Sequence, residues 1–187
     1  MRTLFSILLS LLCKVLFSQT EPPVISNDKF EMYFKSEPLK ISDLSLDAFV
    51  KNHGPDFMYG IESCITEANF PKSDSLKPGT MKRIQIFRII KPATSQECVD
   101  FIKKQGGILP GAHGLAMAYV LIKSKFPFGF PILGFEEQKN LPTDERGIRI
   151  PVIGYYHDGR GFCFDCDTWE GGYWKPYKHF ILFFSDP

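Results

Sequence analysis

The order of apolar and polar residues along this 187-residue chain predicts six short strands. Residues 29–35 alternate between apolar and polar side chains, which is typical of a half-buried strand. The other five predicted strands are runs rich in β-branched, aromatic and other apolar residues, at 83–90, 128–135, 148–156, 160–165 and 179–184. Together they predict a protein whose C-terminal half is mainly sheet.

Two features place these strands relative to one another. His157-Asp158-Gly159 lies between two of the predicted strands, and Asp-Gly turns adopt positive φ at low cost, so we expect a tight hairpin there. Pro131 interrupts the run at 128–135. Since proline has no N–H to donate to a neighbour, this strand is expected near an edge of the sheet.

Three segments have helical signals. Thr94 and Glu97 have the spacing of a capping box, and Gly106-Gly107 ends the amphipathic segment that they begin. Ser45 is the expected cap of a short helix that stops at Gly54-Pro55, and residues 111–124 form a third, mostly apolar helix.

These elements predict one α+β domain over residues 29–187. We expect a mostly antiparallel sheet in the C-terminal half, covered on one face by two helices. The polar stretch 72–80 is the expected internal loop boundary.

Residues 1–18 are typical of a cleaved signal peptide. Arg2 precedes an apolar run, and Lys14 interrupts that run before it reaches the length of about 20 residues that a membrane-spanning helix needs. We therefore expect a secreted or periplasmic protein without a stable membrane anchor, with an extended leader at 19–28 after the signal. An ordinary N-terminal helix is the alternative.

Charge argues against one class of partner. The chain has 22 Lys and Arg against 21 Asp and Glu, and loss of Arg2 and Lys14 with the signal leaves 20 − 21 = −1. Both signs are scattered, so we expect no nucleic-acid binding. Phosphate-binding loops, His-Glu-x-x-His helices and Gly-x-Ser-x-Gly elbows do not occur in the sequence, so we expect no cofactor.

Four cysteines remain if Cys13 leaves with the signal; a lipoprotein would carry its lipid on Cys13. An even number in an oxidising compartment favours disulfides, and the candidates are Cys64, Cys98, Cys163 and Cys166. The Cys163-Phe164-Asp165-Cys166 motif lies on a predicted strand, where residues three apart face opposite sides. We therefore expect neither a metal nor a disulfide within this motif, but one bridge from it to Cys64 or Cys98.

A carboxylate cluster offers an enzymatic alternative. Asp158, Asp165, Asp167 and Glu170 lie in the predicted hairpin and the loop after it, next to His157. Such groups serve as acid and base in secreted hydrolases and as oxygen ligands for calcium, but the spacing of an EF-hand is absent. His113, before an apolar segment, is expected to be a structural histidine at a helix start.

The segment 169–177 contains both tryptophans of the chain. Rings on a loop rich in glycine and proline stack on sugars or anchor a partner protein, unless they fold back over the core. We therefore favour a non-enzymatic module that binds a glycan or a protein, and its candidate ligand-binding residues are Trp169, Tyr173, Trp174 and Tyr177.

The stretch from Ile150-Pro151-Val152 to Asp165, with Asp158-Gly159 and alternating aromatic residues, resembles the sheet of the SMI1/KNR4-like immunity domains. Members of that family are typically cytosolic. The resemblance therefore implies a cytosolic, immunity-type protein-binding domain as the alternative to an exported one.

Overall fold

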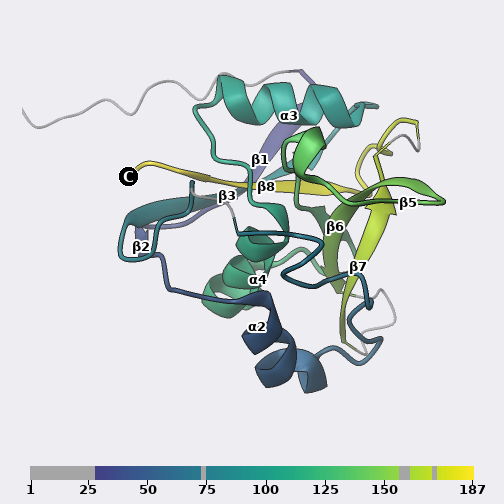
Figure 1. Cartoon of the computed structure of the whole chain (residues 1–187). Helices are drawn as coiled ribbons and strands as arrows, with labels where there is room; N and C mark the ends of the chain where they lie inside the picture. The colour runs from purple at the N-terminus through teal and green to yellow at the C-terminus, as the bar shows by residue number, and fades with distance from the viewer. Residues whose placement is uncertain (1–27, 73–74, 156–160, 170–171) are drawn as a thin grey trace, which may run out of the picture.

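The computed structural model describes residues 28–72, 75–155, 161–169 and 172–187. These residues form a mixed eight-stranded sheet and three α-helices (Figure 1). The strands are β1 Phe30–Lys35, β2 Leu39–Lys40, β3 Met81–Ile89, β4 Pro131–Leu133, β5 Thr143–Asp144, β6 Gly147–Tyr155, β7 Phe162–Thr168 and β8 Phe180–Ser185. The α-helices are α2 Leu46–His53, α3 Ser95–Lys104 and α4 Gly111–Ile122. The predicted signal at 1–18 lies outside the described residues, as does the leader except for Asp28.

The strands pair in the order β1-β3-β8-β4-β6-β5, with β2 also on β3 and β7 also on β6. Every pair is antiparallel except β4 with β8. The α+β class and the mostly antiparallel sheet are therefore confirmed. The N-terminal half also contributes, because β3 lies between β1 and the buried strand β8.

The predicted edge position of the strand around Pro131 is wrong. Strand β4 lies inside the sheet, between β8 and β6. It is shorter than expected and begins at Pro131, and the first residue of a strand is a position where proline is tolerated. Gly154 lies opposite Pro131 and leaves room for the ring, because a Cβ there would be 3.2 Å from the Pro131 Cα.

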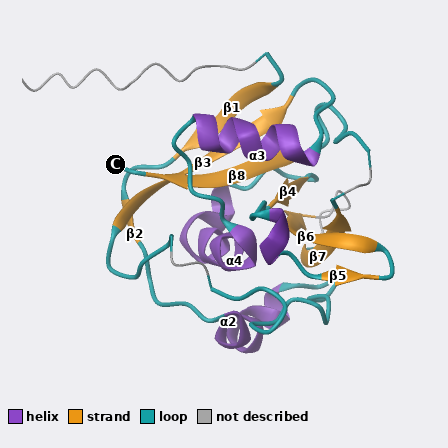
Figure 2. Ribbon diagram, turned by 45° about the horizontal axis from the view of Figure 1, so that its top comes forward, coloured by secondary structure: helices purple, strands orange, loops and turns teal. Residues whose placement is uncertain are grey.

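The two main helices lie on opposite faces of the sheet, whereas the sequence predicted both on one face (Figures 1 and 2). Neighbouring residues of a strand point to opposite sides. Phe183 of β8 contacts Phe101 of α3, and Phe184 lies close to Gly114 of α4. Helix α2 packs beyond α4, where the Phe49 and Tyr119 rings meet edge to face. Apolar residues therefore pack against both faces of β8.

The predicted helix caps are confirmed. The Ser45 hydroxyl accepts a hydrogen bond from the Ala48 N–H at the start of α2. At the start of α3, Thr94 and Glu97 form both hydrogen bonds of the capping box. Local sequence therefore determines where these helices begin.

The expected hairpin is also present as a strand pair. Strands β6 and β7 run antiparallel from Arg149 opposite Thr168 to Tyr155 opposite Phe162. Its turn, residues 156–160, lies outside the described residues. Among the residues that the structure describes, none of the helices is long and apolar enough to cross a membrane.

Candidate functional site

The two tryptophans of the predicted ligand-binding segment belong to the core. Trp169 and Trp174 are only 9% and 8% exposed, and both rings pack edge to face against Phe135. The Ser95 hydroxyl donates to the Trp169 carbonyl (2.8 Å) and accepts from the Trp174 indole N–H (3.1 Å). Both rings are therefore mostly buried in the core, although Trp169 lines a pocket of about 520 Å³ and Trp174 lines one of about 240 Å³.

The two tyrosines of the same segment lie on the surface. Tyr173 is 66% exposed and Tyr177 is 56% exposed. Tyr177 has a φ of 59°, and its N–H donates to the Ile89 carbonyl at 2.7 Å. A left-handed backbone is unfavourable for a tyrosine, and this hydrogen bond to β3 helps to hold it there. The tyrosines are thus the most exposed members of the predicted set.

An open groove lies beside these tyrosines, and we call it the aromatic groove. It has a volume of about 670 Å³, and its lining residues are Phe128, Gly129, Phe130, Pro131, Lys175, Lys178 and His179. Phe128 is 62% exposed, unusual for so large an apolar side chain. A neighbouring pocket of about 240 Å³ contains Tyr173 and shares Lys175 and His179 with the groove. The sequence analysis assigned Phe128 and Phe130 to a strand and therefore missed them.

The charged residues around the aromatic groove are mainly cationic. Lys175 and Lys178 line it, and Arg88 lies over the rings of Tyr177 and Phe180, about 6 Å from each centroid. His179 is half-buried, and burial lowers the pKa of its imidazole, so it is neutral at pH 7. The groove therefore combines apolar rings with lysine ammonium groups.

A second candidate site forms where a loop meets strand β7. Ile61 pairs with Phe164 in an isolated parallel bridge, and the Glu62 N–H donates to the Phe164 carbonyl at 2.8 Å. This pairing places Glu62, and Cys64 two residues later, beside Cys166. Residues about 100 positions apart in sequence thus share one site.

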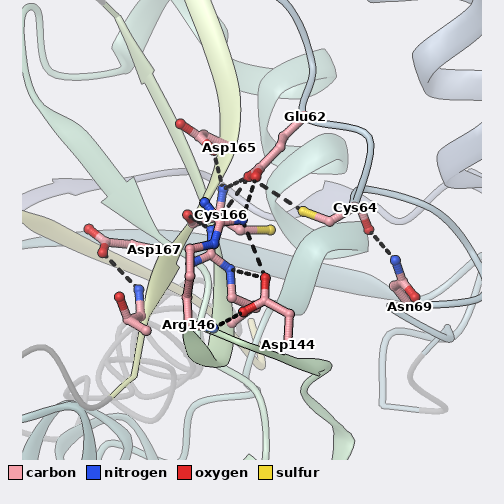
Figure 3. A network of polar contacts seen from close by, with 10 residues as sticks. Glu62, Cys64, Asn69, Asp144, Arg146, Asp165, Cys166 and Asp167 are labelled. Carbon is pink, nitrogen blue, oxygen red and sulfur yellow. Dashed lines mark hydrogen bonds and ion pairs between the residues drawn. The ribbon is translucent and has the colours of Figure 1, made fainter.

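Two thiols and a carboxylate converge there, and we call this group the thiol–carboxylate cluster. The sulfur atoms of Cys64 and Cys166 and a carboxylate oxygen of Glu62 all lie within 4.8 Å of one another. The Cys64 thiol donates to Glu62 Oε2 at 3.5 Å, and the Cys166 backbone N–H donates to the same oxygen at 2.9 Å. Figure 3 shows the side chains of Cys64 and Glu62 pointing toward one another beside Cys166. Such a group has the donor types of a site for a soft cation.

Two guanidinium groups border the cluster. Arg146 Nη2 lies 3.1 Å from Glu62 Oε1, and Nη2 of the buried Arg149 lies 3.6 Å from Glu62 Oε2. Asp144 pairs with both arginines, at 3.3 and 3.5 Å (Figure 3). The carboxylate of Glu62 is therefore kept ionised.

Glu62 also shares a hydrogen bond with Asp165. That bond, the Arg146 guanidinium and the Cys166 N–H lower the pKa of Glu62 to about 2 despite its partial burial. Burial and the same carboxyl partner raise the pKa of Asp165. Of the two carboxyl groups, Asp165 is therefore the one that holds a proton more readily. A direct hydrogen bond brings the carboxyls closer than the separation of about 5 Å in retaining glycosidases.

Of the other residues of the predicted hydrolase, the structure describes only Asp167. Asp167 Oδ1 accepts the Thr168 N–H at 2.7 Å, a contact between neighbouring residues of β7. His157, Asp158 and Glu170 lie outside the described residues. The sequence analysis missed Glu62, because its only relation to Asp165 is through tertiary structure.

All four described cysteines are free thiols. Cys163 and Cys166 lie three positions apart on β7, as predicted, and Cys98 is a buried residue of α3. Burial raises the pKa of Cys98 and Cys163, and the neighbouring Cys64 together with burial raises that of Cys166. Cys64 and Cys166 are the two candidates that the fold brings together.

His113 is buried in α4, and its Nε2 lies 2.8 Å from Glu67 Oε2. Glu67 Oε1 in turn accepts the N–H of Leu46, the first residue of α2. Burial lowers the pKa of His113, against the opposing effect of Glu67. The histidine thus links α4, through Glu67, to the start of α2.

Comparison with known proteins adds no further information on function. No family model, curated protein or solved structure matches this chain. Function is therefore argued from the aromatic groove and the thiol–carboxylate cluster alone.

Proposed function

We propose that this protein is a non-enzymatic binding module, and that its aromatic groove recognises an acidic segment of a partner protein. The observation that carries the proposal is the exposure of Phe128 and Phe130 beside two lysines in one groove. Exposed aromatic rings in a concave surface are typical of protein-binding hot spots, because they bury a large area at low entropic cost.

The lining of the groove favours a protein over a glycan. Phenylalanine rings have no polar edge with which to orient sugar hydroxyls, whereas they pack well against apolar side chains. The ammonium groups of Lys175 and Lys178 match carboxylates on the partner. We therefore expect a segment that combines Asp or Glu with apolar residues.

Export is part of the proposal and is tested separately. The signal pattern at 1–18 predicts that the protein from its own host has lost about twenty residues, the length of an ordinary signal peptide. Intact-mass analysis of that protein measures this directly. A full-length chain beginning at Met1 would favour the cytosolic, immunity-type alternative instead.

The groove is tested with a displayed library of random peptides, selected on the folded protein. We expect enrichment of sequences that contain both acidic and apolar residues. A selected peptide, synthesised with a fluorescent label, should bind the Phe128→Ala/Phe130→Ala variant about tenfold or more weakly, a change of about 1.4 kcal/mol. Lys178→Glu should weaken binding as well, and more strongly at low salt.

Val120→Ala is the matched control, because Val120 is an exposed apolar residue on α4 that does not line the groove. It should bind the peptide as the unchanged protein does. Absence of any enriched motif, or equal binding by the double variant, would overturn the proposal. A glycan-array signal that disappears in the double variant would replace the peptide with a sugar ligand.

A further inference from the structure

We propose that Glu62, Cys64 and Cys166 form a binding site for one soft divalent cation of the zinc class. The site is distinct from the aromatic groove, and this proposal does not rest on the proposed function. The sequence analysis expected no metal at the Cys163–Cys166 motif, because that motif lacks further ligands at metal-site spacing. The fold supplies Glu62 and Cys64 from a distant loop.

The donor atoms have the spacing of a tetrahedral zinc site. Zinc–sulfur and zinc–oxygen bonds of about 2.3 and 2.0 Å place neighbouring ligand atoms about 3.5–3.8 Å apart. Cys64 Sγ and Glu62 Oε2 are already 3.5 Å apart, and all three donors lie within 4.8 Å. The separations in the structure thus differ from those of a zinc site by about 1 Å or less.

The surrounding charges suit a dithiolate centre. Two thiolates and one carboxylate carry a charge of −3, and a divalent cation reduces this to −1. Arg146 and Arg149, both paired with Glu62, offset the remainder. Without a cation, the hydrogen bond with Cys64 and burial raise the pKa of the Cys166 thiol. An ion that displaces the thiol protons therefore binds more tightly as pH rises.

Hydrogen bonds hold the ligands in place. Cys166 lies on β7 in the sheet, and its N–H fixes the carboxylate of Glu62. The Asn69 side-chain amide donates to the Cys64 carbonyl at 2.9 Å and anchors the loop (Figure 3). Cys64 and Glu62 are partly exposed, so one side of the site is open to solvent. Three protein ligands with an open fourth position are typical of an exchangeable or catalytic metal site.

Oxidation of the same two thiols to a disulfide is the competing outcome. Such a bridge would remove both thiol protons and pass two electrons to an external disulfide, which would be reduced to two thiols. The Glu62 carboxylate would then keep its contacts with Arg146, Arg149 and the Cys166 N–H but would ligate nothing. The presence of a carboxylate as third donor therefore favours the cation.

Cobalt(II) is the probe, because its thiolate complexes absorb by charge transfer. We expect the fully reduced protein to bind one equivalent with this absorption, and zinc to displace it. The absorption should disappear in Cys64→Ser and in Cys166→Ser. Glu62→Gln should weaken binding by at least about tenfold, the loss that even an outer-shell partner causes.

Cys163→Ser is the matched control, because this thiol lies on the same strand outside the cluster. It should keep the full cobalt absorption. Thermal unfolding of each variant without metal shows that the serine variants still fold. Absence of the absorption in the folded protein, or its persistence in Cys64→Ser, would overturn the proposal. So would a Cys64–Cys166 disulfide that forms, by intact mass, in the presence of saturating zinc.

Discussion

Individual side chains determine where helices α2 and α3 begin. At α3, the Thr94 hydroxyl accepts the Glu97 N–H at 3.2 Å, and a Glu97 carboxylate oxygen accepts the Thr94 N–H at 2.9 Å. Lys29 Nζ also pairs with Glu97 at 2.5 Å, which ties the cap to the residue before β1. The capping box therefore links a local signal to the tertiary structure.

Thr94→Ala should lower the free energy of unfolding by about 1 kcal/mol, because a donor at the start of α3 loses its acceptor. Denaturant titration measures this change. Thr94→Ser keeps a hydroxyl at the same place and should retain most of the stability. Equal losses in the two variants would show that the hydroxyl is not what stabilises this end.

The carboxyl pair of Glu62 and Asp165 should make the free energy of unfolding depend on pH. Asp165 has a raised pKa, so its ionisation disfavours the folded state, and this cost grows as pH rises above its ordinary value of 3.8. Asp165→Asn removes the cost. The variant should therefore be more stable than the unchanged protein at pH 7, in metal-free buffer, and the difference should vanish toward pH 3.

For Glu62, the expected effect of pH on stability has the opposite direction. Its pKa is lowered to about 2, so its contribution to stability is complete above about pH 4.5 and is lost as pH falls toward 2. Glu62→Gln should thus destabilise the protein at pH 7. Unfolding curves with the same sign for both variants at pH 7 would contradict the shared-proton arrangement.

At the scale of elements, close packing around α4 depends on positions without a side chain. A Cβ at Gly134, which directly follows β4, would lie 2.5 and 2.6 Å from two atoms of Leu115 in α4, and 2.9 Å from the Gly111 carbonyl oxygen. Helix α4 is apolar on nearly all sides and is buried, so Leu115 has little room to move.

Gly134→Ala should therefore cost about 1–3 kcal/mol of stability, the usual range for overpacking. Gly54→Ala is the control, since a Cβ there meets nothing within 4 Å and φ is −47°. The free energy of unfolding of that variant should be unchanged or raised by about 0.4–1 kcal/mol. A Gly134→Ala protein as stable as Gly54→Ala would show that the contact relaxes freely. Thermal or denaturant unfolding of the two variants measures this difference in stability.

At the scale of the whole molecule, both candidate sites depend on segments that are far apart in sequence. The aromatic groove joins residues 128–131 to 175–179, and the thiol–carboxylate cluster joins Glu62 to Cys166, which are 104 positions apart. Strand β7 connects the two regions, since Cys166 is followed by Asp167 and Thr168 in the pocket beside the groove.

Binding of a cation should also raise the stability of the whole folded chain. An ion that binds only the folded chain links the loop of Glu62 to the sheet. Zinc at 100 times its Kd should then raise the free energy of unfolding by about 2.7 kcal/mol. Cys64→Ser should abolish this increase and Cys163→Ser should preserve it, as measured by thermal unfolding with and without zinc.

Features that depend only on neighbours along the chain can be predicted from the amino-acid sequence. Ser45 and Thr94 mark helix starts because their hydroxyls reach backbone N–H groups three residues away. The strands at 83–90, 148–156 and 179–184 follow from apolar and β-branched runs, and the α+β class follows from their order. The opposite directions of Cys163 and Cys166 follow from the alternation of side chains along a strand.

Which of these elements contact one another, and which side chains become buried, depends on the tertiary structure. Alternation along a strand defines two faces, but the elements packed against each face determine what is buried, so Trp169 and Trp174 became core while Tyr173 and Tyr177 did not. The interior position of β4 depends on its pairing with the distant strand β8. Cys64 and Glu62 reach Cys166 through one backbone pairing at Ile61, because contacts between distant residues depend on how the whole sheet assembles.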